Sequence, residues 1–366
     1  MKMTGAKMVV ESLHQEGVEV VFGYPGGAIM NVYDEIYKQN YFQHILNRHE
    51  QASIIAAEGY ARATGKVGVS IVTSGPGFTN AVTGLADAYM DSIPLVVISG
   101  QVPTTIIGSD GFQEIDAVGI SRPCTKHNYL VNRIEDLPRI IKEAFHIAST
   151  GRPGPVHVDI PKDITAQVAD FIYPSEINLP TYKPTVNYNK KQLKRAMEAI
   201  SNAKKPLLYV GGGAVLSNCA FEIRELAKKL NIPAVETLMA RGVMGDENPL
   251  FFGMLGMHGE FAANMAAHET DLLISLGARF DDRVTGRLDE FASKAKIIHV
   301  DIDPTSIAKL VVPDYPIVGD LKVTVKAMIE AIESSENEFN DYTNWVELLR
   351  DYREKEPLRY IDSNEV

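Results

Sequence analysis

The first 165 residues alternate short apolar runs with helical patterns. Val18–Phe22, Val67–Val72 and Leu95–Ser99 have the length and composition of buried strands, and a helical pattern such as Asn80–Met90 separates each from the next. Apolar strands between helices are typical of a parallel sheet that is covered on both faces. We therefore predict a doubly wound α/β domain over residues 1–167.

The same alternation resumes further along the chain. Residues 168–188 are rich in proline and have no helical period, so we interpret them as an interdomain linker. Pro206–Val210 and Leu272–Leu276 again read as buried strands next to helices, which predicts a second doubly wound, Rossmann-like domain over 189–335. Residues 336–366 begin with a polar, acidic stretch, and we interpret them as the start of a linker to a further domain.

Composition narrows the class of protein. The chain has 366 residues and a net charge of −11, which argues against a nucleic-acid binder. Cys124 and Cys219 are far apart in sequence, so there is no zinc signature and the pattern fits a reducing cytoplasm. The N-terminus does not resemble a signal peptide, and no apolar run reaches the roughly 18 residues of a membrane span.

Three glycine-rich turns follow predicted strands and precede predicted helices. They are Gly23–Gly27, Ser74–Gly77 and Gly211–Gly213. Ligands of open α/β sheets bind at the carboxyl ends of strands, and a helix N-terminus there favours phosphate. None of the turns matches the usual dinucleotide or P-loop pattern. Each turn alone is equally well explained as a tight connection.

A few polar residues stand at the same junctions. Glu50 opens a predicted helix, where a carboxylate either complements the helix dipole or acts as an acid–base group. Lys162 follows a strand, and its position alone favours a solvated loop lysine. Asp281–Arg283 fits either an ion-pair network or a grip on phosphate or carboxylate. The run Met254–His258 is more typical of a core than of a cofactor contact.

Taken together, these segments resemble the catalytic subunits of acetolactate synthases, a family of thiamine-diphosphate enzymes. Eight segments carry the resemblance in register through both predicted domains: FGYPGGAIM (22–30), RHEQ (48–51), EGYARATGKVGV (58–69), TSGPG (73–77), FQEID (112–116), GRPGPVHVDIPKD (151–163), GMLGMHG (253–259) and LGARFDDRVTG (276–286). The resemblance implies that the first domain binds the pyrimidine side of thiamine diphosphate and that the second binds FAD.

The resemblance also implies catalytic roles. Glu50 would hydrogen-bond a ring nitrogen of the cofactor's aminopyrimidine and favour the imino tautomer that takes up the thiazolium proton. Gly27 and Ala28 would border the thiazolium, and Gln113 would be an active-site glutamine. Lys162 and Arg283 would lie at the substrate entrance, where cations steer carboxylates.

A second set of residues is implied to contact FAD, which would have no net redox role in the reaction. This set consists of Arg152, Gly211, Gly212, Gly213, Thr237, Leu238, Met239, Met257, His258, Gly259, Gly277, Ala278, Arg279, Asp301, Ile302 and Asp320. No residue of the chain is predicted to bind a metal. The Gly-Asp-Gly motif that holds Mg²⁺ and the diphosphate in this superfamily does not occur here, so we expect that site in a domain outside this sequence.

The expected reaction is the decarboxylation of pyruvate and its ligation to a second 2-keto acid, pyruvate or 2-ketobutyrate. This is the first common step of branched-chain amino-acid biosynthesis. We expect the 366 residues alone to be inactive. Expected partners are further catalytic subunits, in a homodimer or larger oligomer, and a small regulatory subunit. Two alternatives remain: another pyruvate-oxidase-like enzyme of the superfamily, and a non-catalytic FAD-binding module.

Overall fold

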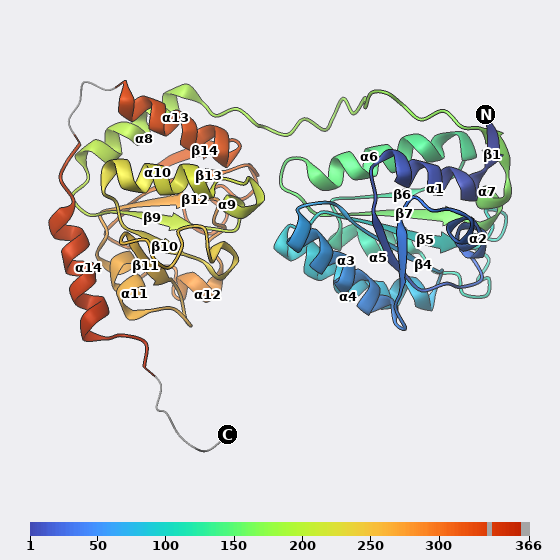
Figure 1. Cartoon of the computed structure of the whole chain (residues 1–366), viewed down its shortest axis with the longest axis horizontal. Helices are drawn as coiled ribbons and strands as arrows, with labels where there is room; N and C mark the ends of the chain where they lie inside the picture. The colour runs from blue at the N-terminus through green and yellow to red at the C-terminus, as the bar shows by residue number, and fades with distance from the viewer. Residues whose placement is uncertain (335–338, 360–366) are drawn as a thin grey trace, which may run out of the picture. The chain divides into compact units, whose positions relative to one another are not determined.

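The computed structural model describes residues 1–334 and 339–359, and these form two compact units (Figure 1). The first unit is Met1–Lys183 and the second begins at Pro184. The division therefore falls within the segment 168–188 that the sequence suggests as a linker.

The first unit contains a parallel six-stranded sheet in the order β3-β2-β4-β5-β7-β6. A separate antiparallel pair joins β1 to β8. The elements of this unit are β1 (Lys2–Thr4), α1 (Gly5–Gln15), β2 (Val20–Gly23), α2 (Met30–Lys38), β3 (Gln43–Leu46), α3 (Glu50–Thr64), β4 (Gly68–Val72), α4 (Pro76–Asp91), β5 (Leu95–Gln101), α5 (Ala117–Ser121), η1 (Arg122–Cys124), β6 (His127–Leu130), η2 (Ile134–Asp136), α6 (Leu137–Ser149), β7 (Pro155–Pro161), α7 (Lys162–Ala166) and β8 (Val168–Asp170).

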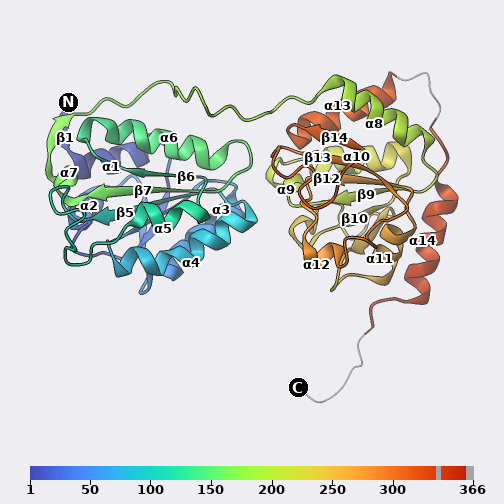
Figure 2. The same cartoon turned by 180° about the vertical axis from the view of Figure 1, so that it is seen from behind.

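Helices cover both faces of this sheet. On β5, Val96 and Ile98 pack into a core with α1, α2 and α6, whereas Leu95 and Val97 pack into a second core with α3, α4 and α5. Because successive strand residues point to opposite faces, a strand buried on both sides must be apolar throughout. This explains the apolar runs in the sequence. Figure 2 shows the two helical layers from behind.

The second unit contains another parallel six-stranded sheet, in the order β11-β10-β9-β12-β13-β14. Its elements are α8 (Lys190–Asn202), β9 (Pro206–Val210), α9 (Gly213–Leu216), α10 (Ala220–Leu230), β10 (Ala234–Glu236), η3 (Leu238–Ala240), β11 (Phe251–Met254), α11 (Phe261–Glu269), β12 (Leu272–Leu276), α12 (Asp282–Thr285), β13 (Lys296–Asp301), β14 (Tyr315–Val318), α13 (Leu321–Glu333) and α14 (Thr343–Lys355).

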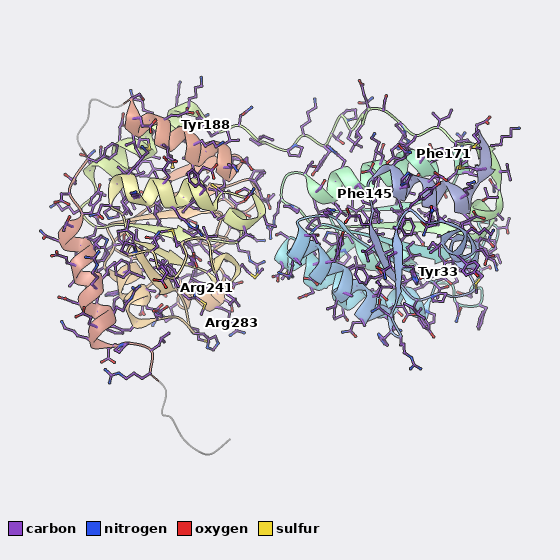
Figure 3. The ribbon with its side chains drawn as sticks, viewed as in Figure 1. Tyr33, Phe145, Phe171, Tyr188, Arg241 and Arg283 are labelled. Carbon is purple, nitrogen blue, oxygen red and sulfur yellow. The ribbon has the colours of Figure 1, made fainter. Side chains whose placement is uncertain are left out.

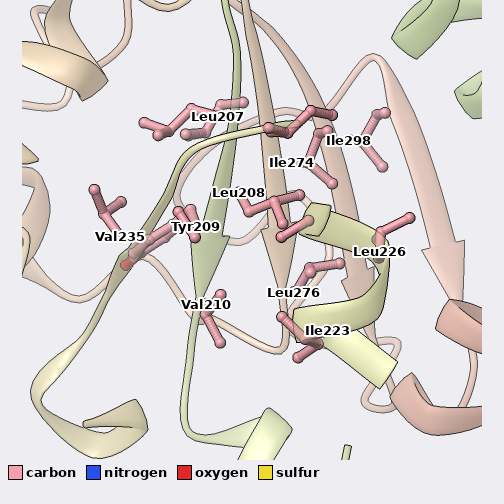
Figure 4. Packing of buried hydrophobic residues seen from close by; sticks show 14 of the residues in the cluster. Leu207, Leu208, Tyr209, Val210, Ile223, Leu226, Val235, Ile274, Leu276 and Ile298 are labelled. Carbon is pink, nitrogen blue, oxygen red and sulfur yellow. The ribbon is translucent and has the colours of Figure 1, made fainter. Parts of the chain in front are cut away.

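The core of the second unit is centred on β9 and β12. Figure 4 shows Ile223 and Leu226 of α10 beside Leu276 of β12, and all three are buried. Helices α8, α10 and α13 cover one face of the sheet, and α11 and α14 pack together on the other (Figures 1 and 2). The predicted fold class, two doubly wound α/β domains with parallel sheets, is therefore confirmed.

Strand order locates the switch point of each sheet. In the first sheet the chain starts at β2, adds β3 on one side, and then crosses to β4 on the other. In the second it starts at β9, adds β10 and β11, and then crosses to β12. The crevice outside the carboxyl ends of the strands at such a point is where open α/β sheets bind ligands. These two places are the β2/β4 junction and the β9/β12 junction.

Helix α14 differs from the sequence interpretation of residues 336–366 as linker. Trp345, Val346 and Leu349 are buried, and the indole Nε1 of Trp345 donates to the carbonyl of Pro206 at 2.9 Å. The Tyr342 hydroxyl donates to the carbonyl of Ile200 at 2.7 Å. The described part of this segment therefore completes the core of the second unit. Similarly, the expected linker begins with strand β8.

Replacing Tyr342 with phenylalanine tests this attachment. The change removes the side-chain hydrogen bond to the carbonyl of Ile200, which keeps its bond from the Ala203 amide, so the free energy of unfolding should fall by about 1 kcal/mol. Urea denaturation followed by circular dichroism measures it. Tyr37→Phe is the matched control, because Tyr37 is 92% exposed and should lose almost nothing. Equal losses in the two variants would contradict the packing of α14.

None of the helices in the described residues is long and apolar enough to cross a membrane.

Candidate functional site

Glu50 lies at the β2/β4 junction of the first sheet. Glu50 is the first residue of α3 and is only 8% exposed. The preceding His49 caps the helix, because its ring Nδ1 accepts from the amide of Gln51. The side-chain amide of Asn80, in α4, donates to Glu50 Oε2 at 3.0 Å. A carboxylate is thus held in a fixed orientation in a nearly buried position.

Two glycines leave space beside this carboxylate. A Cβ atom on Gly77 would lie 3.3 Å from Glu50 Oε1 and 2.6 Å from the Thr73 methyl, and one on Gly26 would lie 2.5 Å from Thr73 Cβ. Thr73 Oγ1 is buried and has no hydrogen-bond partner within the described residues. Since buried polar atoms are normally paired, Thr73 Oγ1 indicates a place for a polar ligand atom near Glu50.

Neutral polar groups lie on the other side of the junction. The Tyr33 hydroxyl (Figure 3) donates to the carbonyl of Ile71 at 2.9 Å. A Cβ on Gly23 would lie 2.2 Å from the Tyr33 hydroxyl oxygen. Burial, with a smaller contribution from the negative charge of Glu50, raises the pKa of Tyr33. Burial lowers the pKa of His44, whose ring packs edge-on against Tyr33. Tyr33 therefore stays uncharged at neutral pH.

We define the carboxyl edge of the first sheet as the edge formed by the C-terminal ends of β2, β4, β5 and β7. The predicted catalytic residues of the first unit lie at this edge. The turn with Gly27 and Ala28 crosses the end of β5, because a Cβ on Gly100 would lie 2.9 Å from the carbonyl carbon of Ala28. The backbone carbonyl of Gln113 would lie 2.6 Å from a Cβ on Gly75. Exposed Lys162 opens α7 directly after β7.

Arg152 lies at the opposite edge of the sheet. It precedes β7, and its Nε donates to the Ser92 hydroxyl, which precedes β5, at 2.8 Å. The structure therefore separates Arg152 from Glu50, Gln113 and Lys162. The roles of all these residues stay predictions.

The β9/β12 junction of the second sheet is built from closely packed glycines. The amide of Gly211 donates to the carbonyl of Leu276 and that of Gly213 donates to the carbonyl of Gly277, both at 3.0 Å. A Cβ on Gly211 would lie 2.3 Å from the Gly277 oxygen, and one on Gly213 would lie 2.8 Å from Gly277 Cα. Gly277 has a φ of +68°, which glycine adopts without strain. These glycines bring two backbone segments together at the switch point.

Replacing Gly211 with alanine should therefore destabilise the second unit. The new methyl group meets backbone atoms that cannot rotate away, so the free energy of unfolding should fall by about 1–3 kcal/mol. Gly59→Ala is the control, because nothing lies within 4 Å of a Cβ in that helical position. Calorimetry of both variants makes the comparison. A Gly211→Ala protein as stable as the wild type would show that the approach is not tight.

Exposed apolar side chains surround this second junction. Leu238, Met239 and Met257 are 72%, 40% and 64% exposed, and His258 is exposed as well. Thr237 Oγ1 is buried without a hydrogen-bond partner in the described part of the chain. The amide of Met257 donates to the carbonyl of Arg283 at 2.8 Å, which joins the Gly253–Gly259 loop to α12. The junction thus offers exposed apolar side chains next to backbone, together with a hydroxyl that has no partner among the described residues.

Three charged residues of this unit that were predicted to bind ligands, Arg279, Arg283 and Asp320, contact groups close to them in sequence. Arg279 pairs with Asp281 at 3.2 Å, and exposed Arg283 (Figure 3) lies 4.0 Å from Asp282. Asp281 also accepts from the backbone amide of Arg283 at 3.0 Å. Asp320 caps α13 by accepting from the amide of Val323 at 3.0 Å.

Two further FAD candidates lie at the end of β13: Asp301 is its last residue, and Ile302 follows the strand. Asp301 Oδ1 accepts from the amide of Asp303 at 2.9 Å. The second Asp301 oxygen, Oδ2, lies 3.7 Å from the Nε2 of buried His299. One oxygen of the Asp301 carboxylate therefore stabilises the turn that follows β13.

One cluster of carboxylates in the described residues has metal-ligand spacing, formed by Glu58, Asp87 and Asp91. Arg62 fills it, since its Nη2 lies 2.6 Å from both Glu58 Oε1 and Asp91 Oδ2. Arg62 therefore pairs with two of the three carboxylates, Glu58 and Asp91.

Sequence reasoning missed several groups at the first site. Asn80 and Thr73 both contact the surroundings of Glu50, yet neither was singled out. The polar residues within the apolar strands were a usable signal: Gln101 in β5 and Asp159 in β7 are buried and hydrogen-bonded to each other. A polar residue in a strand that is buried on both faces requires a partner.

Comparison with known families agrees with the two units. Residues 3–120 match the N-terminal TPP binding domain of thiamine pyrophosphate enzymes, and residues 193–328 match the central domain of the same enzymes. The chain therefore contains two consecutive domains of that architecture.

Individual relatives are similar along nearly the whole chain. The acetolactate synthase large subunit of Haemophilus influenzae is 49% identical over 98% of this chain and 63% of its own length. The isozyme 3 large subunit of Escherichia coli is 47% identical over 99% of the chain and 64% of its own length, and the acetolactate synthase of Mycobacterium leprae is 50% identical over 98% and 58%. The chain thus spans about three-fifths of the length of these relatives, and it belongs to the thiamine pyrophosphate enzyme family, among the homologues of acetolactate synthase large subunits.

Proposed function

We propose that the enzyme to which this chain belongs is an acetolactate synthase, which decarboxylates pyruvate and joins the remaining two carbons to a second pyruvate or to 2-ketobutyrate. The observation that carries the proposal is identity of 47–50% to such subunits through both units. The site supports it, because a nearly buried carboxylate lies at the β2/β4 junction. Branched-chain amino-acid biosynthesis in the cytoplasm follows as the proposed setting.

Glu50 is proposed as the acid–base group toward thiamine diphosphate. When bound, that cofactor supplies the carbon nucleophile and the electron sink for decarboxylation. The carboxylate fits a heterocyclic ring nitrogen, because Asn80 occupies Oε2 while Oε1 faces the space that Gly77 leaves open. Thr73 Oγ1 offers a further hydrogen bond there. Glu50 would hold a proton at Oε1 and exchange it with the ring nitrogen.

The other residues at the carboxyl edge are proposed to act on the keto acid. Lys162 supplies a positive charge that attracts the carboxylate. The exposed Gln113 side chain supplies an uncharged donor that orients the substrate, and the lack of side-chain bulk at Gly27 and Ala28 leaves room for the reacting atoms. Arg283, also exposed and cationic, is proposed to serve the substrate entrance.

FAD is the proposed ligand of the second unit. The paired glycines at the β9/β12 junction permit close approach of a diphosphate to backbone, the unpaired Thr237 hydroxyl offers a polar contact, and exposed Leu238, Met239 and Met257 suit a flat ring. These features support the fit. Mg²⁺ is proposed to bind with the diphosphate through residues outside this sequence.

We propose a homodimer or larger oligomer together with a small regulatory subunit. The outer side of α3 supports the first part. Ala52, Ile55 and Ala63 lie at helical spacing and are exposed, with Ile55 at 47%. Small and apolar residues along one helix face permit close packing against a partner.

Product analysis tests the proposed function. The complete enzyme should convert pyruvate to carbon dioxide and acetolactate in the presence of thiamine diphosphate, Mg²⁺ and FAD. Release of acetyl phosphate or acetate in place of acetolactate would refute the proposal in favour of a pyruvate-oxidase-like reaction. Absence of turnover with any 2-keto acid would refute both.

A further inference from the structure

A buried chain of polar side chains crosses the first sheet directly beneath the carboxyl edge. Strands β5 and β7 pair in parallel with Ser99 opposite Asp159, so side chains from both strands point to the same face. The Ser99 hydroxyl lies 2.5 Å from Asp159 Oδ1 and 2.7 Å from the Nε2 of His157. Gln101 Nε2 donates to Asp159 Oδ2 at 3.0 Å. All four residues are at most 3% exposed.

Gln101 connects these buried polar side chains to the loop that carries Gln113. Its Nε2 also donates to the carbonyl of Ile115 at 2.9 Å, and its Oε1 accepts from the amide of Val102 at 2.8 Å. Both hydrogens and the oxygen of the amide are therefore engaged, which fixes its rotation. Ile115 lies two residues beyond Gln113, whose own backbone packs against Gly75.

The loop is strained and exposed around Gln113, while the Ile115 side chain packs against the core beneath α3 and α4. Gln113 adopts a φ of +59°, which is unfavourable for a residue with a side chain, and neighbouring Phe112 is 89% exposed. Glu114 ties the loop to itself through the amides of Gly108 and Gly111. The contact from Gln101 to Ile115 instead ties it to the sheet.

A purely structural explanation accounts poorly for this arrangement. A buried carboxyl group surrounded by polar partners generally costs more than an apolar packing of the same volume. Asp116 also faces Asp159, and its negative charge adds to burial in raising the pKa of Asp159 to about 7. His157, on the far side of Ser99, is the other titratable group of this buried polar network, and burial lowers the pKa of His157 to about 3. A costly network of this kind is expected where it fixes a functional geometry.

We propose that Gln101 and Asp159 are positioning residues that hold the Gln113 loop over the carboxyl edge. Asp159 orients the Gln101 amide, and Gln101 in turn fixes the carbonyl of Ile115. The proposal rests on the proposed function, because it assigns the pair an effect on turnover through Gln113.

Amide hydrogen exchange on the 366-residue chain tests the physical tie without any activity. Gln101→Met keeps the length of the side chain and removes both donors. Protection of the amides in 112–116 should fall about tenfold, and Asp159→Leu, which removes the acceptor for Gln101, should produce a similar loss. Thr125→Val is the matched control, since Thr125 is buried and donates a hydrogen bond to the carbonyl of Ser121. Unchanged protection in Gln101→Met, or an equal loss in Thr125→Val, would overturn the proposal.

A double-mutant cycle in the complete enzyme tests the effect on function. If Gln101 acts through Gln113, Gln101→Met should lower kcat/KM for pyruvate about tenfold in the wild-type background and leave it unchanged in the Gln113→Ala background. The affinity for thiamine diphosphate should stay the same. Additive losses would refute positioning through Gln113. If the complete enzyme forms no acetolactate at all, the proposed function fails, while hydrogen exchange still decides whether the tie exists.

Discussion

Replacing Glu50 with glutamine is expected to lower kcat of the complete enzyme by at least about 100-fold, which is the usual contribution of a positioned acid–base group. Glutamine has the same shape, and its carbonyl oxygen can still accept from the Asn80 amide, as Glu50 Oε2 does. The position of Glu50 Oε1 is then occupied by the amide nitrogen of glutamine, which cannot exchange a proton with the cofactor near neutral pH. Fold and cofactor affinity should therefore change little while turnover is lost. Initial rates of acetolactate formation measure the effect.

Glu19→Gln is the control for Glu50→Gln. Glu19 is an exposed surface residue whose contact with Lys66 is screened by solvent. Its kcat should equal that of the wild type, and circular dichroism should show the same fold for both variants. A Glu50→Gln enzyme with unchanged kcat would remove Glu50 from the mechanism.

The buried His157 and Asp159 are expected to give opposite pH dependences of stability when each is removed. Burial raises the pKa of Asp159 to about 7 from an ordinary value near 3.8, so its contribution to stability is fully present below pH 4 and is lost as pH rises to 7. Burial lowers the pKa of His157 to about 3 from 6.5, so its contribution is present above pH 6.5 and is lost as pH falls toward 3. Between pH 4 and 6.5 the two effects offset each other in the wild type.

Single variants separate these two effects. Relative to the wild type, Asp159→Asn should gain stability as pH rises from 4 to 6.5, because only the His157 contribution remains. His157→Gln should lose stability over the same range. Each change is on the order of 4 kcal/mol at most, since a tenfold change in proton affinity corresponds to about 1.4 kcal/mol.

Denaturant unfolding of the three proteins at several pH values gives the differences directly. Comparison with the wild type cancels the titration of other groups, Asp116 included. Parallel pH dependences in Asp159→Asn and His157→Gln would contradict the assignment of the two groups as a buried neutral histidine and a buried carboxyl of raised pKa.

The sheets were predictable from the sequence because burial on both faces leaves a direct trace in composition. Leu95–Ser99 reads as an apolar run, and the structure extends it to Gln101 in β5. Glycine-rich turns at strand ends likewise predict where ligand sites form. Glu50 could be placed at such an edge because it opens a helix shortly after strand β3 ends at Leu46.

Contacts between distant segments could not be predicted in this way. Asn80 reaches Glu50 across 30 positions, and Gln101 reaches Asp159 across 58. Both depend on the register of packed elements, which a single sequence does not specify. Helix α14 was missed for a related reason: its apolar residues form a short stripe in a polar segment, and Trp345 finds its partner, Pro206, 139 positions away.

Exchange of the thiazolium C2 proton of bound thiamine diphosphate with deuterated solvent tests the central claim most directly. The claim is that Glu50, held by Asn80 at the β2/β4 junction, activates the cofactor. We predict that exchange in the complete enzyme slows by at least about 100-fold in Glu50→Gln and is unchanged in Glu19→Gln. Equal exchange rates in the wild type and Glu50→Gln, at full cofactor occupancy, would contradict the account.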